Sequence, residues 1–172
     1  MEIRIATSSD AAVLAALNVD VQRIHAEAYP HIFIYPHDSS FALPFMQERL
    51  VDPDSYFYLA SLDGEDVGYV YARLVNRPGN PFALPWRVVV IDQISVKPSH
   101  QRQGIGEALV QQVRALARAL GVTTIALDTW AFNEGAHAFF ARQGFHLYNL
   151  RMWTDEPPGG SQIPGESASK GK

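Results

Sequence analysis

The segment 92–106 carries the residues of this chain best suited to chemistry, because glycines stand where a strand gives way to a helix. It reads DQISVKPSHQRQGIG, and a polar turn after Val96 leads into Gly104 and Gly106. The first turn of a helix has unpaired N–H groups at the positive end of its dipole. Phosphate oxygens can accept hydrogen bonds from those amides when no side chain blocks the approach, and Arg102 could add positive charge. The segment therefore indicates a phosphate-bearing ligand, although a plain tight turn before a helix has the same pattern.

The elements around this segment predict an α/β protein. Alternating or continuous apolar runs indicate strands, and apolar residues recurring every three or four positions indicate helices. In chain order we expect a strand near 2–6, a helix that ends before Pro30, a short helix at 45–50, strands at 56–62, 67–75 and 87–96, a helix at 104–120, a strand at 123–129, a helix at 133–143 and a last strand from 144 to about 153. The middle three strands should be antiparallel, and the strand–helix–strand unit after them parallel. This order predicts a mixed, mostly antiparallel central sheet flanked by helices.

The length of the chain, 172 residues, suits one domain with a substantial core. We assign that domain to residues 1–153. Residues 154–172 are rich in proline, glycine and serine and poor in apolar residues, so they predict a disordered C-terminal tail.

Composition excludes several classes of function. The net charge of −4 and the lack of a dense basic stripe argue against nucleic-acid binding. The chain has no cysteine, which excludes disulfides, thiolate metal sites and a cysteine nucleophile. His25, His31 and His37 have no metal-binding spacing with carboxylates, so no metal is expected. No signal peptide and no apolar run near 20 residues is visible, so we expect a soluble, cytoplasmic protein without membrane contact.

Two blocks of the sequence resemble the GCN5-related N-acetyltransferase (GNAT) superfamily. The first is Val96-Lys97-Pro98 followed by Gln101-Arg102-Gln103-Gly104-Ile105-Gly106 and an amphipathic helix. The second runs from Asn133 through Ala136 and Phe139-Phe140 to Gly144-Phe145. The spacing between the blocks and the expected order of elements match the family as well. The resemblance covers about residues 1–153 and is specific because both blocks are present.

The resemblance implies acetyl-coenzyme A as the acetyl donor. Loop amides would hold its pyrophosphate, the backbone of the preceding strand would bind its pantetheine arm, and a β-bulge would splay that strand from the next. The motif asparagine would contact the cofactor arm, and an aromatic residue of the last helix would pack near its sulfur. The implied cofactor-binding positions are Ile94, Ser95, Val96, Gln101, Arg102, Gln103, Gly104, Ile105, Gly106, Asn133, Phe139 and Phe140.

Acetylation of an amine also needs a base, because an alkylammonium has a pKa of about 10.4 and must lose a proton before it attacks. Asp92 and Asp128 lie on predicted central strands where members of the family carry carboxylates, so both are catalytic candidates. Either aspartate could instead pair with an arginine or cap a neighbour. Phe140 stands where many family members have a tyrosine that protonates the departing thiolate. Tyr148, His137 or water would have to replace it, or the thiolate leaves unassisted.

The acceptor is the least determined part of the prediction. The resemblance places the first two helices beside the acceptor pocket, so Tyr29, Phe33 and Trp130 are expected to contact a substrate, although such side chains often only cover a core. We expect an N-acetyltransferase that acts by direct attack in a ternary complex on a small-molecule amine, and a homodimer is possible. The alternatives are an acetyltransferase for protein N-termini or lysines and a non-catalytic acyl-coenzyme A sensor or interaction module.

Overall fold

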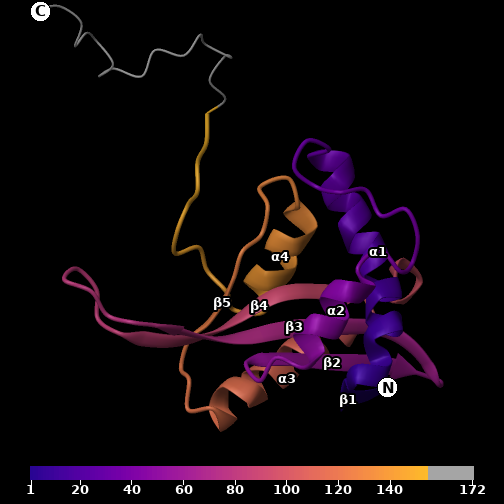
Figure 1. Cartoon of the computed structure of the whole chain (residues 1–172), viewed down its shortest axis with the longest axis horizontal. Coiled ribbons are helices and arrows are strands. Elements are labelled where there is room, and N and C mark those ends of the chain that lie inside the picture. The colour runs from indigo at the N-terminus through magenta and orange to yellow at the C-terminus, as the bar shows by residue number, and fades with distance from the viewer. Residues whose placement is uncertain (155–172) are drawn as a thin grey trace, which may run out of the picture.

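The computed structural model describes residues 1–154, so the predicted disorder of 154–172 falls, apart from Thr154, outside the described residues. Its centre is one five-stranded sheet in the order β1-β2-β3-β4-β5. The strands are β1 (Glu2–Ile5), β2 (Ser55–Leu62), β3 (Glu65–Arg77), β4 (Trp86–Val96) and β5 (Ile125–Leu127). The first four pair antiparallel and β5 pairs parallel with β4. The predicted mixed, mostly antiparallel sheet is confirmed (Figure 1).

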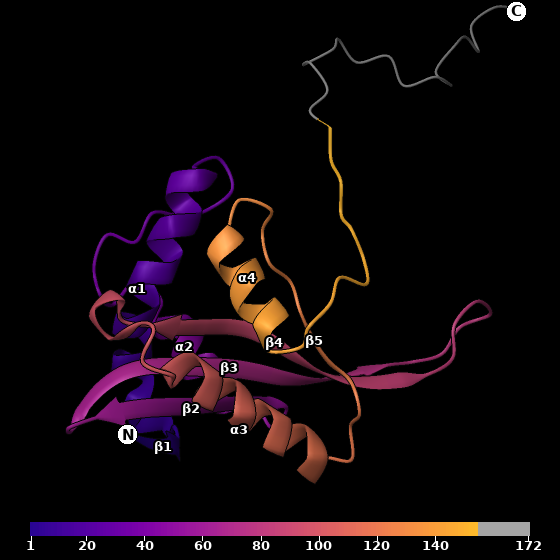
Figure 2. The ribbon, with the colours of Figure 1, turned by 180° about the vertical axis from the view of Figure 1, so that it is seen from behind.

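Helices cover both faces of the sheet. The helices α1 (Ala11–Ala28) and α2 (Leu43–Leu50) lie on one face, where they bury Leu14, Leu17 and Met46 against aromatic residues of β2 and β3. Seen from behind in Figure 2, α3 (Ile105–Ala119) crosses the opposite face. Its apolar residues recur every three or four positions and pack on the valines and isoleucines of β3 and β4. The last helix, α4 (Glu134–Arg142), lies beside the β5 end of the sheet.

A short 3-10 turn, η1 (Ser8–Asp10), anchors the start of α1. The Asp10 carboxylate accepts hydrogen bonds from both Arg4 guanidinium nitrogens, at 2.8 and 2.7 Å, and from the Thr7 amide at 2.7 Å. The Arg4 hydrogen bond, the largest cause, holds the pKa of Asp10 well below its usual range. The first helix is therefore tied to β1 through a charged group that is almost fully buried.

The pairing of β4 changes at Asp92. Tyr71 of β3 pairs with Gln93, but the next residue, Ala72, pairs with Ile91, so Asp92 is an extra residue in β4. Such a β-bulge bends the strand and locally increases its twist. The pairing of β4 with β5 ends at Ile91↔Leu127, one residue before the bulge. Beyond that point the two parallel strands separate, so the expected bulge and splay are both present.

The last described residues and β5 differ from the prediction. Residues 144–154 form no strand, and β5 has three residues rather than the seven expected at 123–129. The apolar pattern of 144–153 suits a strand, but a strand exists only where a partner supplies hydrogen bonds, and none does so within residues 1–154.

The same described range contains no helix long and apolar enough to cross a membrane.

Candidate functional site

The loop between β4 and α3 has the backbone shape expected of an anion cradle. A single 3-10 turn, η2 (Pro98–His100), follows β4, and then Arg102 and Gly104 both adopt left-handed backbone angles, with φ of +62° and +83°. The side chain of Gln101 donates to the carbonyl oxygen of Val96 at 3.1 Å, which ties the loop to the strand. Gln101, Arg102, Gln103 and Gly104 are exposed, whereas Ile105 is buried and anchors the first turn of α3. The loop therefore leaves the N-terminus of a 15-residue helix open to solvent.

The two motif glycines are required for different reasons. Gly104 is the N-cap of α3 in the left-handed region, where a side chain is disfavoured, although a Cβ atom there would meet nothing within 4 Å. Gly106 has no such backbone constraint, but a Cβ atom on it would lie 3.2 and 3.3 Å from the Phe139 ring. The sequence suggested that both glycines clear an approach for phosphate. In the structure Gly104 permits the loop conformation, and Gly106 lets α4 pack closely against α3.

The end of β4 offers backbone groups rather than side chains. Ile94 and Val96 pack into the core on the α3 face, and the buried Ser95 hydroxyl donates to the Leu17 carbonyl oxygen of α1 at 2.8 Å. Their backbone pairs with β3 on one side, while β5 has already separated on the other. At the predicted residues Ile94, Ser95 and Val96, the side of β4 that faces away from β3 is therefore unpaired. This stretch of β4 runs directly into the loop before α3.

The two candidate catalytic aspartates lie where β4 and β5 part. Asp92 and Asp128 each follow directly after the last β4–β5 pair, one on each strand. Asp92 forms a two-pronged ion pair with Arg73, in which Arg73 Nη2 lies 3.0 Å from Oδ1 and Nε contacts Oδ2. This bond raises the pKa of Arg73. Asp128 is exposed and makes no side-chain hydrogen bond or ion pair within residues 1–154. The arginine pairing considered for either aspartate therefore occurs at Asp92.

The second sequence block forms α4 and its packing on α3. Asn133 is the N-cap of α4, and its Oδ1 accepts from the Ala136 amide at 3.0 Å. Phe139 faces Gly106, whereas Phe140 is buried edge-on against Phe145 with ring centroids 5.5 Å apart. The side-chain amide nitrogen of Asn133 keeps its donors for another partner. Phe140 has no polar group, and its burial makes it a core residue of this helix.

The three aromatic residues predicted at the acceptor site lie together. The Trp130 ring centroid is 5.1 Å from those of both Tyr29 and Phe33. Further rings join them, so we define the aromatic cluster as His25, Tyr29, Phe33, Trp130, Phe132 and Trp153. It joins the end of α1 and the loop after it to the loop before α4 and to the end of the described chain. Sequence reasoning missed Phe132 and Trp153, and their spacing from Trp130 carries no signal that could have found them.

A buried polar network was also missed. The Asn18 side-chain amide of α1 donates to the Tyr69 hydroxyl at 2.7 Å, and that hydroxyl donates to Gln93 Oε1 at 2.8 Å. Burial of Tyr69 raises its pKa well above the usual range. Gln93 is the residue after the bulge, so the network joins α1 and β3 to β4 beside the point where the strands separate. Residues separated by 51 and 24 positions make these contacts, which is why no local pattern reveals them.

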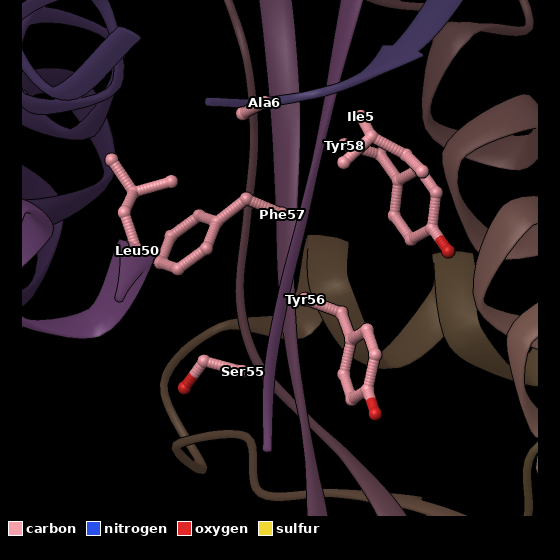
Figure 3. A pocket seen from close by; sticks show the side chains of 7 residues that line it. All are labelled: Ile5, Ala6, Leu50, Ser55, Tyr56, Phe57 and Tyr58. Carbon is pink, nitrogen blue, oxygen red and sulfur yellow. The ribbon is translucent and has the colours of Figure 1, made fainter. Parts of the chain in front are cut away.

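The pocket shown in Figure 3 lies apart from these residues. It encloses about 170 Å³ and is lined by Ile5, Ala6, Leu50, Ser55, Tyr56, Phe57 and Tyr58. Along β2 the side chains alternate, so Phe57 points toward Leu50 whereas Tyr56 and Tyr58 point to the other side of the strand. The pocket contains none of the predicted site residues, and we assign it no role in the chemistry.

Comparison with known proteins agrees with this arrangement. Residues 18–145 match the model of the acetyltransferase (GNAT) family. The chain is 30% identical over 122 residues to the aminoglycoside N(6')-acetyltransferase type 1 of Klebsiella aerogenes, covering 71% of this chain and 78% of that one. It spans only 60% and 42% of the lengths of two other curated relatives.

Solved structures share the fold. A tetramutant of the BH1408 protein from Bacillus halodurans superimposes with a TM-score of 0.85 at 24% identity, covering 91% of this chain and all of that one. An aminoglycoside N-acetyltransferase, AAC(6')-Iy, solved in complex with CoA, superimposes with a TM-score of 0.69 at 19% identity, covering 90% and 93%. At these identities the likeness is one of fold.

Proposed function

The chain belongs to the acetyltransferase (GNAT) family and is an N-acetyltransferase, and from this we propose that it moves an acetyl group from acetyl-coenzyme A to a small primary amine. The attack would be direct, in a ternary complex of both substrates. One observation carries the proposal. The stretch of β4 that β5 leaves unpaired, residues 94–96, continues directly into the loop 101–106 and the N-terminus of α3.

The donor half of the proposal rests on two chemically different stretches in one segment. The loop from Gln101 to Gly106 offers amides and a helix N-terminus to the pyrophosphate, and Arg102 adds positive charge. Residues 92–96 offer backbone donors and acceptors to the amides of the pantetheine arm. A related fold in complex with CoA supports this choice of donor.

The acceptor half rests on the residues around the point where β4 and β5 separate. Asp92 and Asp128 flank that point, and the aromatic cluster with Tyr29, Phe33 and Trp130 lies over the adjoining helices and loops. Aromatic faces suit a compact amine, whether it stacks or presents a cationic group. The aminoglycoside relative supports a small molecule as the first class of acceptor to test.

The proposed chemistry assigns a proton path to the carboxylates. A base removes a proton from the ammonium, and the neutral nitrogen attacks the thioester carbonyl carbon. The nitrogen then loses its second proton to water or to the departing thiolate, and the C–S bond breaks as the amide forms. Asp128 is the better candidate base because Asp92 is already held by Arg73. Backbone amides of β4 would stabilise the carbonyl oxygen. Phe140 cannot protonate the thiolate, but a thiol pKa of about 8.5 lets it leave unassisted.

The direct test is release of free coenzyme A thiol when the protein is mixed with acetyl-coenzyme A and a panel of amines. The panel should contain aminoglycosides, polyamines, amino acids and peptides with free N-termini. We expect thermal stabilisation by acetyl-coenzyme A and thiol release with a small amine. Stabilisation without thiol release for any amine would instead favour a sensor, and no stabilisation would contradict both readings.

A further inference from the structure

The bulge in β4 places two adjacent side chains on one face of the sheet. In a regular strand, successive side chains point to opposite faces. Ile91 and Ile94 both pack into the core on the α3 face, yet two residues lie between them instead of one. Those two residues, Asp92 and Gln93, therefore both face the side of α1, next to the point where β5 separates from β4.

The contacts with β3 agree with this placement. Tyr69 and Tyr71 belong to the core cluster beneath α1, and Arg73 is the next residue of β3 with that orientation. Asp92 pairs with Arg73, and Gln93 accepts from the Tyr69 hydroxyl at 2.8 Å. A carboxylate and a carboxamide thus lie next to each other on the α1 face, where a strand without the bulge would hold only one of them.

The carboxamide of Gln93 is held in one orientation by the buried polar network. Its Oε1 accepts from the Tyr69 hydroxyl and from Asn18 Nδ2, at 2.8 and 3.2 Å. Asn18 Nδ2 also donates to the Tyr69 hydroxyl at 2.7 Å, so the proton of that hydroxyl is free to go to Gln93. Asn18 and Tyr69 are buried, and buried polar groups need such partners. A flip of the Gln93 amide alone would turn its nitrogen toward two donors.

The other half of this carboxamide remains open to a ligand. Gln93 Nε2 makes no hydrogen bond within residues 1–154, and in that range no side-chain nitrogen or oxygen is both buried and unpaired. The nitrogen therefore reaches solvent, on the same face as Asp92. Its N–H groups can donate to an oxygen with lone pairs, whereas an ammonium group has only donors.

We propose that Gln93 selects acceptors that carry a hydroxyl or ether oxygen close to the amino group. This inference rests on the proposed function and narrows the class of its acceptor. The ammonium group of such an acceptor turns toward the carboxylates at 92 and 128, while its oxygen accepts from Gln93 Nε2. Amino alcohols and amino ethers have this arrangement, and alkylamines lack it. Because Asn18 and Tyr69 fix the carboxamide before the acceptor binds, little side-chain freedom is lost on binding.

The test compares 2-methoxyethylamine with butylamine, which differ only by an oxygen in place of a methylene group. Thiol release gives kcat/KM for each amine, and the ratio of ether to alkylamine is the quantity of interest. Gln93→Glu should lower this ratio about tenfold, the loss expected for one hydrogen bond to the acceptor. The variant keeps an oxygen for Tyr69 and Asn18 and changes only the outward donor, so it should remain folded. Taking the ratio cancels the effect of the added charge on both amines.

The matched control is Gln111→Glu, which adds the same charge at an exposed position of α3, on the opposite face of the sheet. This variant should keep the wild-type ratio. A second measurement does not need turnover, because the side-chain ¹H–¹⁵N signals of Gln93 are identified by their absence from the spectrum of Gln93→Glu. In the complex with coenzyme A these signals should shift on addition of 2-methoxyethylamine and stay in place with butylamine.

An unchanged ratio in Gln93→Glu would overturn the proposal, and thiol release from butylamine would still support acetylation of amines. An equal loss of rate for both amines would also overturn it, since Gln93 would then act on a step common to both. If neither amine is acetylated, the Gln93 signals decide, and signals that respond to both amines alike or to neither would overturn the assignment.

Discussion

The loop that leads into α3 is built from consecutive residues, whereas the aromatic cluster gathers six rings from three separated parts of the chain. The first region, residues 92–106, is the proposed donor site and relies on backbone conformation. The second is the proposed acceptor wall and relies on side chains. The backbone groups of the first region can bind any acyl-coenzyme A, whereas the side chains of the second region can differ between proteins that use different acceptors. The difference shows why a donor is easier to infer than an acceptor.

The largest expected effect comes from the carboxylates at the boundary between the two regions. Asp128→Asn should lower kcat by about 100-fold or more, because a positioned base contributes roughly 10²–10⁴-fold. Asp92→Asn should lower kcat less, since Arg73 already holds that carboxylate. The measurement is kcat against pH with the best amine of the panel. Equal kcat values for both variants and wild type would show that neither aspartate is the base.

A change in backbone conformation alone should weaken binding of the donor by residues 92–106. Gly104→Ala should weaken acetyl-coenzyme A binding about tenfold, because a left-handed residue with a Cβ costs about 1–2 kcal/mol and the loop would relax out of shape. Isothermal titration calorimetry measures the change. Gly64→Ala is the matched control, since Gly64 has φ of +85° and open space at its Cβ but lies in the β2–β3 turn. Both variants should lose stability, and an affinity loss in both would contradict a local role for Gly104.

The acceptor region should respond to loss of a ring. Trp130→Ala should raise the KM of the amine about two- to tenfold, because an aromatic contact contributes roughly 0.5–1.5 kcal/mol beyond area burial. The KM of acetyl-coenzyme A should stay unchanged. Phe45→Ala is the control, since Phe45 is a half-exposed ring that contacts Tyr71 outside the cluster. A rise in both KM values for Trp130→Ala would show that the two regions are not separable.

The polar network that joins α1 and β3 to β4 should contribute to stability. Tyr69→Phe removes the hydroxyl that accepts from Asn18 and donates to Gln93, and the loss of a buried hydrogen bond costs about 0.5–1.5 kcal/mol. Urea unfolding measures the change, with Phe57→Leu as an apolar comparison on the same face. Full stability in Tyr69→Phe would mean that the network does not fasten α1 to the sheet.

The smallest effect is a dependence on pH at the start of α1. Since the folded pKa of Asp10 is depressed, its contribution to stability is complete above the unfolded value of about 3.9 and is lost as the pH falls through the folded pKa. Asp10→Asn should therefore flatten part of the fall in stability below about pH 4. Thermal unfolding at pH 3 and pH 7 gives the comparison. Identical acid sensitivity in wild type and variant would contradict the assignment.

Local patterns predicted most of the fold. The helix that ends before Pro30, the hairpin at Asp63–Gly64 and the strand–glycine–helix junction at Gly104 depend on residues that are neighbours in the chain. The prediction failed at 144–153 because an apolar pattern makes a strand possible but cannot supply its partner. The shortened β5 shows the same limit, because only Ile125, Ala126 and Leu127 find partners in β4.

The sequence by itself determined the family, the order of the elements and the loop that leads into α3, because their signals lie within a few residues of one another. Only the tertiary structure decided that Asp92 is the bulged residue paired with Arg73, that Gly106 makes room for Phe139, and that Trp153 joins the aromatic cluster. These contacts depend on how strands and helices cross, and a linear pattern does not encode the distance between residues far apart in the chain.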